Sequence, residues 1–243
     1  MVIACIFAGG VGRRMKSTDM PKQFLMVGQK PIIIRTMWHF EKHPEVDHIV
    51  VACKEEWIDH LNGLIQEYGL KKVTAVIPGG ETGYASIHNG IMKAAEIMEN
   101  KKDIVLICDG VRPILSEKLI SDSINYARKY ETAVPVTPSI DSLLYSEDGE
   151  ECQKSYERSS MYVTQAPQGY TMEKILWAHE EAEKRGIINA VSSSELLIEL
   201  GEKVHLFKGE RSNIKVTTPE DLEHLRATFF YRAMRTYANE EIQ

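Results

Sequence analysis

The sequence has few cysteines, no long apolar run and no excess of basic residues, and each of these absences excludes a class of protein. Its four cysteines are scattered, without a Cys-x-x-Cys pair or a histidine at metal-ligand spacing, which excludes a zinc motif and a disulfide framework. No apolar stretch approaches the ~20 residues of a membrane helix, and no basic region precedes the first strand-like segment as in a signal peptide. The formal net charge of −6 does not fit a nucleic-acid-binding protein. We therefore expect a cytoplasmic protein with reduced thiols and with neither a membrane nor a nucleic acid as partner.

Short runs rich in valine and isoleucine alternate along the chain with longer segments of helical period. Because the runs are apolar throughout, they predict strands buried on both faces, in a mostly parallel, Rossmann-like α/β sheet flanked by helices. The predicted strands and helices are Val2–Ala8, His48–Cys53, Val73–Pro78, Asp103–Cys108 and Thr132–Val136, with Ile32–Lys42, Glu55–Tyr68, Ala85–Glu99 and Ser116–Lys129 between them. We find neither a repeat nor a linker, so we expect one domain over residues 1–243.

A hairpin interrupts this alternation in the second half of the chain. The strand-like Ser142–Ser146, the turn-rich Glu147–Glu150 and the polar return Lys154–Tyr156 predict an arm over about residues 138–158. A two-stranded ribbon is marginal by itself in water, so this arm needs another surface. We favour a second subunit over the alternative that the arm folds back on its own domain.

A glycine-rich loop follows the first predicted strand. Ligands of parallel sheets bind at the carboxyl ends of strands, and the loop from Ala8 contains Gly9, Gly10 and Gly12, followed by arginines that include Arg14. Glycines permit close approach of the backbone to an anion, and arginines donate to phosphate. The loop lacks the third glycine of a dinucleotide fingerprint and the Gly-Lys-Ser/Thr of a P-loop. A tight turn with solvated arginines remains the structural alternative.

Four further positions are candidates for phosphoryl chemistry. Lys22 follows a proline that stiffens its loop, Gly80 and Ser86 belong to a second glycine-containing loop, and Asp109 ends an apolar strand. Such an aspartate favours Mg²⁺ held between carboxylate and phosphates, although an ion pair with Arg112 would also account for it. The alternative for Lys22 is a solvated surface lysine. The alternative for Gly80 and Ser86 is a flexible loop in which Ser86 is an ordinary residue of the first helical turn.

These motifs, in this order, resemble the cytidylyltransferases of sugar-alcohol phosphates, which include the methylerythritol phosphate and ribitol 5-phosphate enzymes. The resemblance extends to about residue 225 and rests on six segments: Ala8–Met15, Pro21–Phe24, Gly79–Ser86, Asp109–Pro113, Ala166–Gln168 and Asn213–Thr217. It implies transfer of a cytidylyl group from CTP to a polyol phosphate. Family enzymes are homodimers whose hairpin arm reaches the neighbouring active site.

The resemblance also implies a role for individual residues. Arg14, Lys22 and Lys215 would stabilise charge on the reacting phosphates, and Asp109 would bind Mg²⁺. The nucleotide would lie on Ala8, Gly9, Gly10, Gly12, Gly80, Ser86 and Asp109. The polyol phosphate would contact Arg112, Ser142 and Arg158, of which Arg112 and Ser142 would meet it across the subunit interface.

Departures from the family pattern bear on the second substrate. Gly83 stands where the family usually has arginine, and Ser192 stands where it often has aspartate. The segment Thr137–Ser142 is longer than in the methylerythritol branch, and Arg211–Asn213 resembles the ribitol branch. We therefore rank ribitol 5-phosphate ahead of methylerythritol 4-phosphate, the alternative. Two other classes stay open: a catalytically silent nucleotide-binding homologue, and a nicotinamide-dependent oxidoreductase, which the missing third glycine disfavours.

Overall fold

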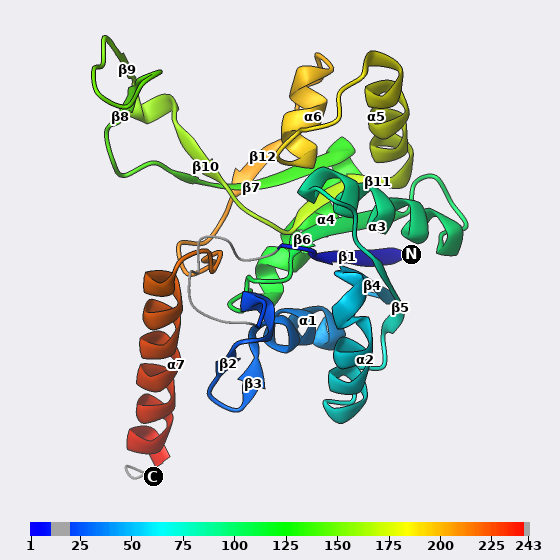
Figure 1. Cartoon of the computed structure of the whole chain (residues 1–243), viewed down its shortest axis with the longest axis vertical. Coiled ribbons are helices and arrows are strands. Elements are labelled where there is room, and N and C mark those ends of the chain that lie inside the picture. Colours follow the sequence, from blue (N-terminus) through cyan, green and yellow to red (C-terminus); the bar gives the residue numbers. More distant parts are fainter. Residues whose placement is uncertain (11–19, 241–243) are drawn as a thin grey trace.

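A mixed sheet forms the centre of the computed structural model, which describes residues 1–10 and 20–240 (Figure 1). Across the sheet the strands are β10 (Tyr162–Thr164), β7 (Thr132–Pro138), β11 (Gln168–Thr171), β6 (Ile104–Asp109), β1 (Val2–Ala8), β4 (His48–Cys53) and β5 (Val73–Pro78), while β12 (Leu206–Lys208) pairs with β7. Strands β6, β1, β4 and β5 are parallel, as the apolar runs predicted. Since β1 pairs with both β4 and β6, the chain order reverses there, where open α/β sheets bind ligands.

Strand β11 runs antiparallel to both β6 and β7, and the sequence pattern did not predict it. It has only four residues and carries Gln168 and Thr171 at its ends, so it lacks an apolar run. Its second residue, Gly169, lies so close to the neighbouring helix that an added Cβ would be 2.5 Å from the carbonyl oxygen of Ser123. The strand therefore depends on close packing rather than on strand propensity.

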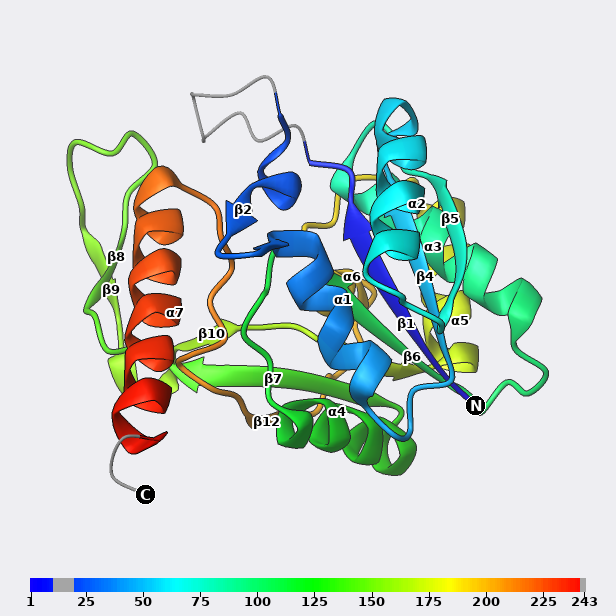
Figure 2. The ribbon, with the colours of Figure 1, turned by 90° about the horizontal axis from the view of Figure 1, so that it is seen from below.

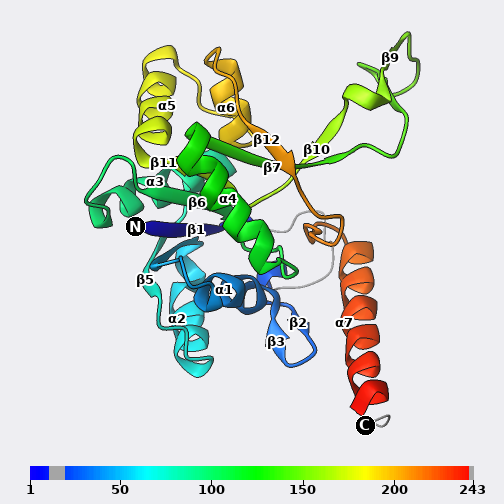
Figure 3. The same cartoon turned by 180° about the vertical axis from the view of Figure 1, so that it is seen from behind.

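Helices cover both faces of the sheet (Figures 1 and 3). One apolar cluster joins alternate β1 residues, among them Ala4 and Ile6, to α1 (Ile32–Lys42), α2 (Ile58–Glu67) and α4 (Glu117–Tyr130). The β1 side chains on the other face, those of Ile3 and Cys5, pack against α3 (Gly83–Ile97), α5 (Met172–Arg185) and α6 (Ser193–Glu199). Full burial of an aliphatic side chain stabilises a fold by about 1.5–3 kcal/mol, so both faces hold the strands of the site in place.

Several short elements join the larger ones. These are the 3₁₀ turns η2 (Lys22–Phe24), η3 (Glu55–Trp57) and η4 (Arg158–Ser160), and the small ladder of β2 (Met26–Val27) with β3 (Lys30–Pro31). The last helix, α7 (Pro219–Glu240), packs at its start on a third apolar cluster that includes Val27, Val216 and Leu225. Within the described residues, none of the helices combines the length and apolar character needed to cross a membrane.

The hairpin consists of β8 (Leu143–Tyr145) and β9 (Lys154–Tyr156), as the sequence indicated. It projects from the body of the molecule, on the same side as α7 (Figures 1 and 2). Leu144 is 69% exposed and Tyr145 is 48% exposed. Within the described chain, the two strands pair with each other rather than with the central sheet, so the ribbon does not extend the sheet of its own domain.

Candidate active site

A cavity of about 880 Å³ lies at the carboxyl ends of β1, β5 and β6, and we call it the glycine cavity. The segments that follow these strands contribute Gly9 and Gly10, Gly79 and Gly80, and the side chain of Asp109, and Lys22 and Lys215 complete the wall. Three loops far apart in the sequence thus meet at one place, as the strand order requires.

The hydroxyl of Ser86 explains why two of these positions, Gly9 and Gly79, are glycines, while an added Cβ at Gly80 would clash with the Cβ of Ala85. Its Oγ accepts a hydrogen bond from the Gly80 N–H at 3.1 Å and lies 3.0 Å from the Thr82 carbonyl oxygen, to which it donates. A Cβ at Gly9 would lie 2.8 Å from this oxygen, and one at Gly79 would lie 3.0 Å from it. The backbone of both loops therefore lies close to the hydroxyl, and we call the part of the glycine cavity lined by Gly9, Gly79, Gly80 and Ser86 the slot.

Lys22 lies on a turn that is held in place by the two side chains after it. Gln23 is buried and donates from Nε2 to the carbonyl oxygen of Ala8 at 2.6 Å. Phe24 is also buried, and its ring stacks on that of Trp57 with centroids 5.0 Å apart. The turn therefore holds the backbone of Lys22 beside the loop that follows β1, and the side chain of Lys22 lines the glycine cavity. The sequence pattern did not single out Gln23 or Trp57.

Asp109 is a buried carboxylate with one cation on each oxygen. Lys215 Nζ lies 2.5 Å from Oδ1, and Arg112 Nε donates to Oδ2 at 2.8 Å. Burial raises the pKa of Asp109, but the two cations more than offset it, so its pKa lies below the usual range and the group is charged. The ion pair with Arg112 that the sequence left as an alternative is therefore present, and Lys215 joins it.

Arg112 is itself held by a loop that is distant in sequence. Its Nη1 donates to the backbone carbonyl oxygen of Asn213 at 3.2 Å, and the Asn213 side chain donates to the Ala166 carbonyl oxygen at 2.7 Å. Gln165 donates to the Glu210 carbonyl oxygen at 2.8 Å and so secures the same loop. Asn213 is 2% exposed. Because it precedes Lys215 by two residues, this network fixes the backbone from which the Lys215 side chain extends.

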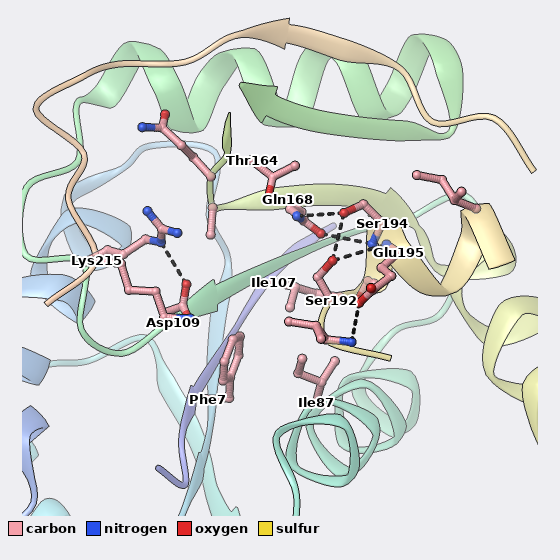
Figure 4. Close-up of a pocket in the computed structure, with 16 residues that line it drawn as sticks. Phe7, Ile87, Ile107, Asp109, Thr164, Gln168, Ser192, Ser194, Glu195 and Lys215 are labelled. Carbon is pink, nitrogen blue, oxygen red and sulfur yellow. Dashed lines mark hydrogen bonds and ion pairs between the residues drawn. The ribbon is translucent and has the colours of Figure 1, made fainter. Parts of the chain in front are cut away.

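A second cavity of about 500 Å³ lies on the other side of this ion cluster, and we call it the serine cavity. The segment Ser192–Ser194 and Gln168 form one end of it, and Asp109 with Lys215 forms the other (Figure 4). Asp109, Lys215 and Phe7 line both cavities. The three side chains are therefore a shared wall at which ligands in the two cavities would meet.

The structure brings most of the predicted site residues together but leaves two apart. Ala8, Gly9, Gly10, Lys22, Gly80, Ser86, Asp109 and Lys215 line the glycine cavity, and Arg112 lines the serine cavity. Ser142 and Arg158 are exposed at the base of the hairpin and line neither cavity, and Arg158 donates to the Ile140 carbonyl oxygen at 3.4 Å. Gly12 and Arg14 lie outside the described residues.

The metal-binding potential of the site resides in one carboxylate. Over residues 1–10 and 20–240, no group of three or more histidine, cysteine, aspartate or glutamate side chains is arranged to hold an ion. Mg²⁺ in nucleotide enzymes is usually bound by one or two carboxylates together with substrate phosphates and water. Asp109 fits that pattern, because each of its oxygens has a lone pair beyond the one its cation occupies.

Comparison with known proteins agrees with this geometry. Residues 2–232 match the model of the IspD family, described as 2-C-methyl-D-erythritol 4-phosphate cytidylyltransferase. The chain is 38% identical to the ribitol-5-phosphate cytidylyltransferase of Vibrio parahaemolyticus, over 91% of this chain and 92% of that protein. It is 36% identical to the 2-C-methyl-D-erythritol 4-phosphate cytidylyltransferase of Clostridium acetobutylicum, over 91% and 94%. The crystal structure of 4-diphosphocytidyl-2C-methyl-D-erythritol synthase from Anaerococcus prevotii superimposes with a TM-score of 0.78 at 25% identity, over 94% and 95%.

Proposed function

We propose a function that starts from the family to which this chain belongs, that of the 2-C-methyl-D-erythritol 4-phosphate cytidylyltransferases. The chain is an enzyme of cytidylyl transfer, and its second substrate is D-ribitol 5-phosphate, with CDP-ribitol and pyrophosphate as products. The observation that carries this proposal is the shared wall of Asp109 and Lys215, because a group-transfer enzyme must join a nucleotide site to an acceptor site at the reacting phosphorus.

In this proposal CTP occupies the glycine cavity. The slot around Ser86 holds the cytosine and ribose, while the loop that begins with Gly9 and Gly10 lies along the triphosphate. Support comes from the main-chain lining of the slot, since backbone N–H groups and small residues admit phosphate oxygens closely. Lys22 and Arg14 neutralise charge on the α-phosphate, and Lys215 lies nearest to the acceptor.

The polyol phosphate occupies the serine cavity with its phosphate toward Arg112 and Lys215. A phosphate oxygen attacks the α-phosphorus of CTP in line, a new P–O bond forms, and the bond to the β-phosphate breaks so that pyrophosphate leaves. No side chain becomes covalently attached. The chain contributes position and fixed positive charge, and such electrostatic stabilisation is the larger part of catalysis in phosphoryl transfer.

Asp109 is the residue that would hold Mg²⁺ in this proposal. Bound there, the ion would neutralise phosphate charge and orient the leaving pyrophosphate. The support is chemical: a charged carboxylate that lines the cavity proposed for the nucleotide suits a hard cation. Arg112 and Lys215 keep Asp109 ionised, which any role in ion binding requires.

Ribitol 5-phosphate ranks ahead of 2-C-methyl-D-erythritol 4-phosphate on the residues of the acceptor side. Identity alone does not separate the two, because the relatives that carry these names are 38% and 36% identical to this chain. Ser192 lines the serine cavity where much of the family has aspartate. The longer segment Thr137–Ser142 and the sequence Arg211–Asn213 add to this ranking.

The proposal also covers the oligomeric state of the enzyme, its location in the cell and the use of its product. The enzyme is a homodimer in which the hairpin of one subunit reaches the active site of the other, so that Ser142 contacts the substrate there, near the partner's Arg158. The exposed Leu144 and Tyr145 support this, because a ribbon so apolar needs a covering surface. The four free thiols support a cytoplasmic location, and a CDP-polyol is a suitable donor for a cell-wall or capsule polymer.

Pyrophosphate release tests this function. CTP and Mg²⁺ are mixed with ribitol 5-phosphate, with methylerythritol 4-phosphate or with no acceptor. We expect release that depends on both substrates and is fastest with ribitol 5-phosphate. Binding of CTP without release from any polyol phosphate would instead identify a catalytically silent homologue.

A further inference from the structure

The second half of α7 leaves the body of the protein with apolar side chains exposed. Its first half buries Leu222 and Leu225 in the third apolar cluster. From Phe230 to Arg235 every side chain is exposed, and the exposed fraction of Phe230 is 68% and that of Met234 is 56%. A stretch of helix without a packed face gains little stability in water, and such apolar side chains usually mark a contact surface. This half of α7 therefore needs a covering surface.

The exposed half of α7 is also basic, although the chain has a net charge of −6. Arg226, Arg232 and Arg235 are exposed, and the sequence contains no acidic residue between Glu223 and Glu240. Packing this half against the same half of a second α7 would bring like charges together. A partner that offers apolar side chains together with carboxylates fits this surface better.

The hairpin offers this combination. Its first strand exposes Leu144 and Tyr145, and its turn over residues 147–151 contains four acidic residues in five positions, all of them exposed. The turn is ordered, because Asp148 Oδ1 accepts the backbone N–H groups of the next two acidic residues at 2.9 Å and 3.2 Å. Figure 1 shows the hairpin and the end of α7 at opposite ends of the molecule, so a chain does not cover its own helix. The hairpin that fits α7 is therefore that of a second copy.

The two elements also match in length. Six residues of strand from Ser142 to Asp148 span about 20 Å. Thirteen residues of helix from Pro219, where α7 begins, to Arg232 also span about 20 Å. Because Pro219 follows Lys215 by four residues, a partner hairpin whose base lies at the active site brings its acidic turn to Arg232.

We infer that residues 226–235 of α7 receive the hairpin of the second copy. The apolar side chains of the hairpin pack on Phe230 and Met234, and its acidic turn lies beside Arg232 and Arg235. Under a two-fold axis the contact forms twice, once for each hairpin. The inference rests on the homodimer of the proposed function and adds the surface on which the arm is held.

Cross-linking tests the contact directly. Cys152 follows the acidic turn and is exposed, whereas the other three cysteines are buried. In Arg235→Cys, a short bismaleimide should join Cys152 of one subunit to the introduced thiol of the other and give a covalent dimer on a denaturing gel. Lys184→Cys is the matched control, because it places a thiol at the exposed end of α5, and it should give no covalent dimer.

A second control removes the thiol of the hairpin. Arg235→Cys combined with Cys152→Ser should stay monomeric on the gel. A covalent dimer that persists without Cys152 would place α7 against α7 and overturn the inference. The absence of a covalent dimer in Arg235→Cys alone would overturn it as well.

Charge exchange measures the same contact without thiol chemistry. Glu150→Arg with Glu151→Arg, and separately Arg232→Glu with Arg235→Glu, should each raise the dissociation constant of the dimer about tenfold through like-charge repulsion. All four substitutions together should restore a value near that of the wild type. The absence of recovery in the fourfold variant would overturn the inference.

Lys184→Glu with Arg185→Glu makes the same change of charge on α5 and should leave the dissociation constant unchanged. Sedimentation equilibrium gives all of these values without turnover. A dimer that recovers by charge exchange but releases no pyrophosphate would refute the proposed reaction and leave the contact standing. Pyrophosphate release by a dimer that shows no recovery would refute the contact and leave the reaction standing.

Discussion

Lys215 Nζ lies 2.5 Å from one carboxylate oxygen of Asp109, in a wall that belongs to two cavities at once. The contact joins the last residue of β6 to a segment more than a hundred residues further along the chain. Because Arg112 occupies the other oxygen, the cluster has two positive charges and one negative charge. In the proposed function this net positive charge would lie where the phosphates of the two substrates meet, and it would then hold anions as well as stabilise the fold.

Replacement of Lys22 tests the positive charge on the opposite wall. Lys22→Ala should lower kcat by more than about a hundredfold, because loss of one donor to a transition-state oxyanion costs roughly 3–4 kcal/mol. Stopped-assay turnover and circular dichroism should be measured together. The matched control is Lys54→Ala, which removes a lysine paired with Glu56 at the rim of the same cavity. Normal turnover in Lys22→Ala would show that the active site lies elsewhere.

Asp109→Asn tests the carboxylate. The change keeps the shape and removes the charge that Mg²⁺ prefers, so the Mg²⁺ concentration for half-maximal rate should rise at least several-fold. The measurement is a titration of rate against Mg²⁺ at saturating CTP, with thermal melting as a check on folding. A Mg²⁺ requirement equal to that of the wild type would mean that Asp109 serves Arg112 and Lys215 alone.

Much of this arrangement could be predicted from the sequence, and the limits have physical causes. The apolar runs predicted the parallel strands correctly because a strand buried on both faces needs apolar residues throughout. They also identified the loops that form the glycine cavity. The serine cavity was not predicted as a cavity, since its residues come from the short strand β11, from α6 and from Asp109, and only folding brings them together. The positioning residues Gln23 and Asn213 act through contacts that have no sequence period.

Gly9→Ala tests the slot in the glycine cavity. A Cβ at this position would lie 2.8 Å from Ser86 Oγ, so the hydroxyl must move and its bond with the Gly80 N–H must weaken. We expect the KM for CTP to rise about tenfold or more, with little change for the polyol phosphate. Gly83→Ala is the control, because a Cβ there has no atom within 4 Å and alanine favours the helix. Equal effects of the two substitutions on CTP would contradict the account.

Base preference provides an independent test of the same slot. In the proposed function the base lies in the slot beside Ser86, and the family preference is for a pyrimidine, so pyrophosphate release should be faster with CTP than with ATP or GTP. The measurement is kcat/KM for each nucleotide at a fixed concentration of ribitol 5-phosphate. Equal values for CTP and ATP would refute the placement of the base beside Ser86.

His179 gives the stability of the fold a pH dependence. Burial, with a contribution from the neighbouring His88, lowers the pKa of His179 to about 4. The unfolded chain binds this proton near pH 6.5 and the folded protein does not, so stability falls as the pH drops from about 6.5 to 4, by roughly 3 kcal/mol from this group. Denaturant unfolding at several pH values should show this slope in wild type and a smaller slope in His179→Leu. Substitution of the exposed His224 should leave it unchanged; equal slopes in all three proteins would exclude the assignment.

Removal of the hairpin tests the assembly. Replacement of residues 143–156 by a short glycine-serine linker should give a monomer that still binds CTP and turns over poorly, because Ser142 could no longer be placed near the partner's Arg158. Light scattering reports the oligomeric state, and calorimetry with CTP reports the nucleotide site. A trimmed monomer with full activity would contradict the shared-site proposal.

The identity of the acceptor is tested most directly by competition. CTP, Mg²⁺ and equal concentrations of ribitol 5-phosphate and methylerythritol 4-phosphate are incubated with the enzyme, and the CDP-alcohols formed in the initial phase are separated by mass. The ratio of products equals the ratio of kcat/KM values, so it does not depend on the concentration of enzyme. We expect CDP-ribitol to predominate by at least about tenfold. A predominance of the methylerythritol product, or the absence of both products, would contradict it.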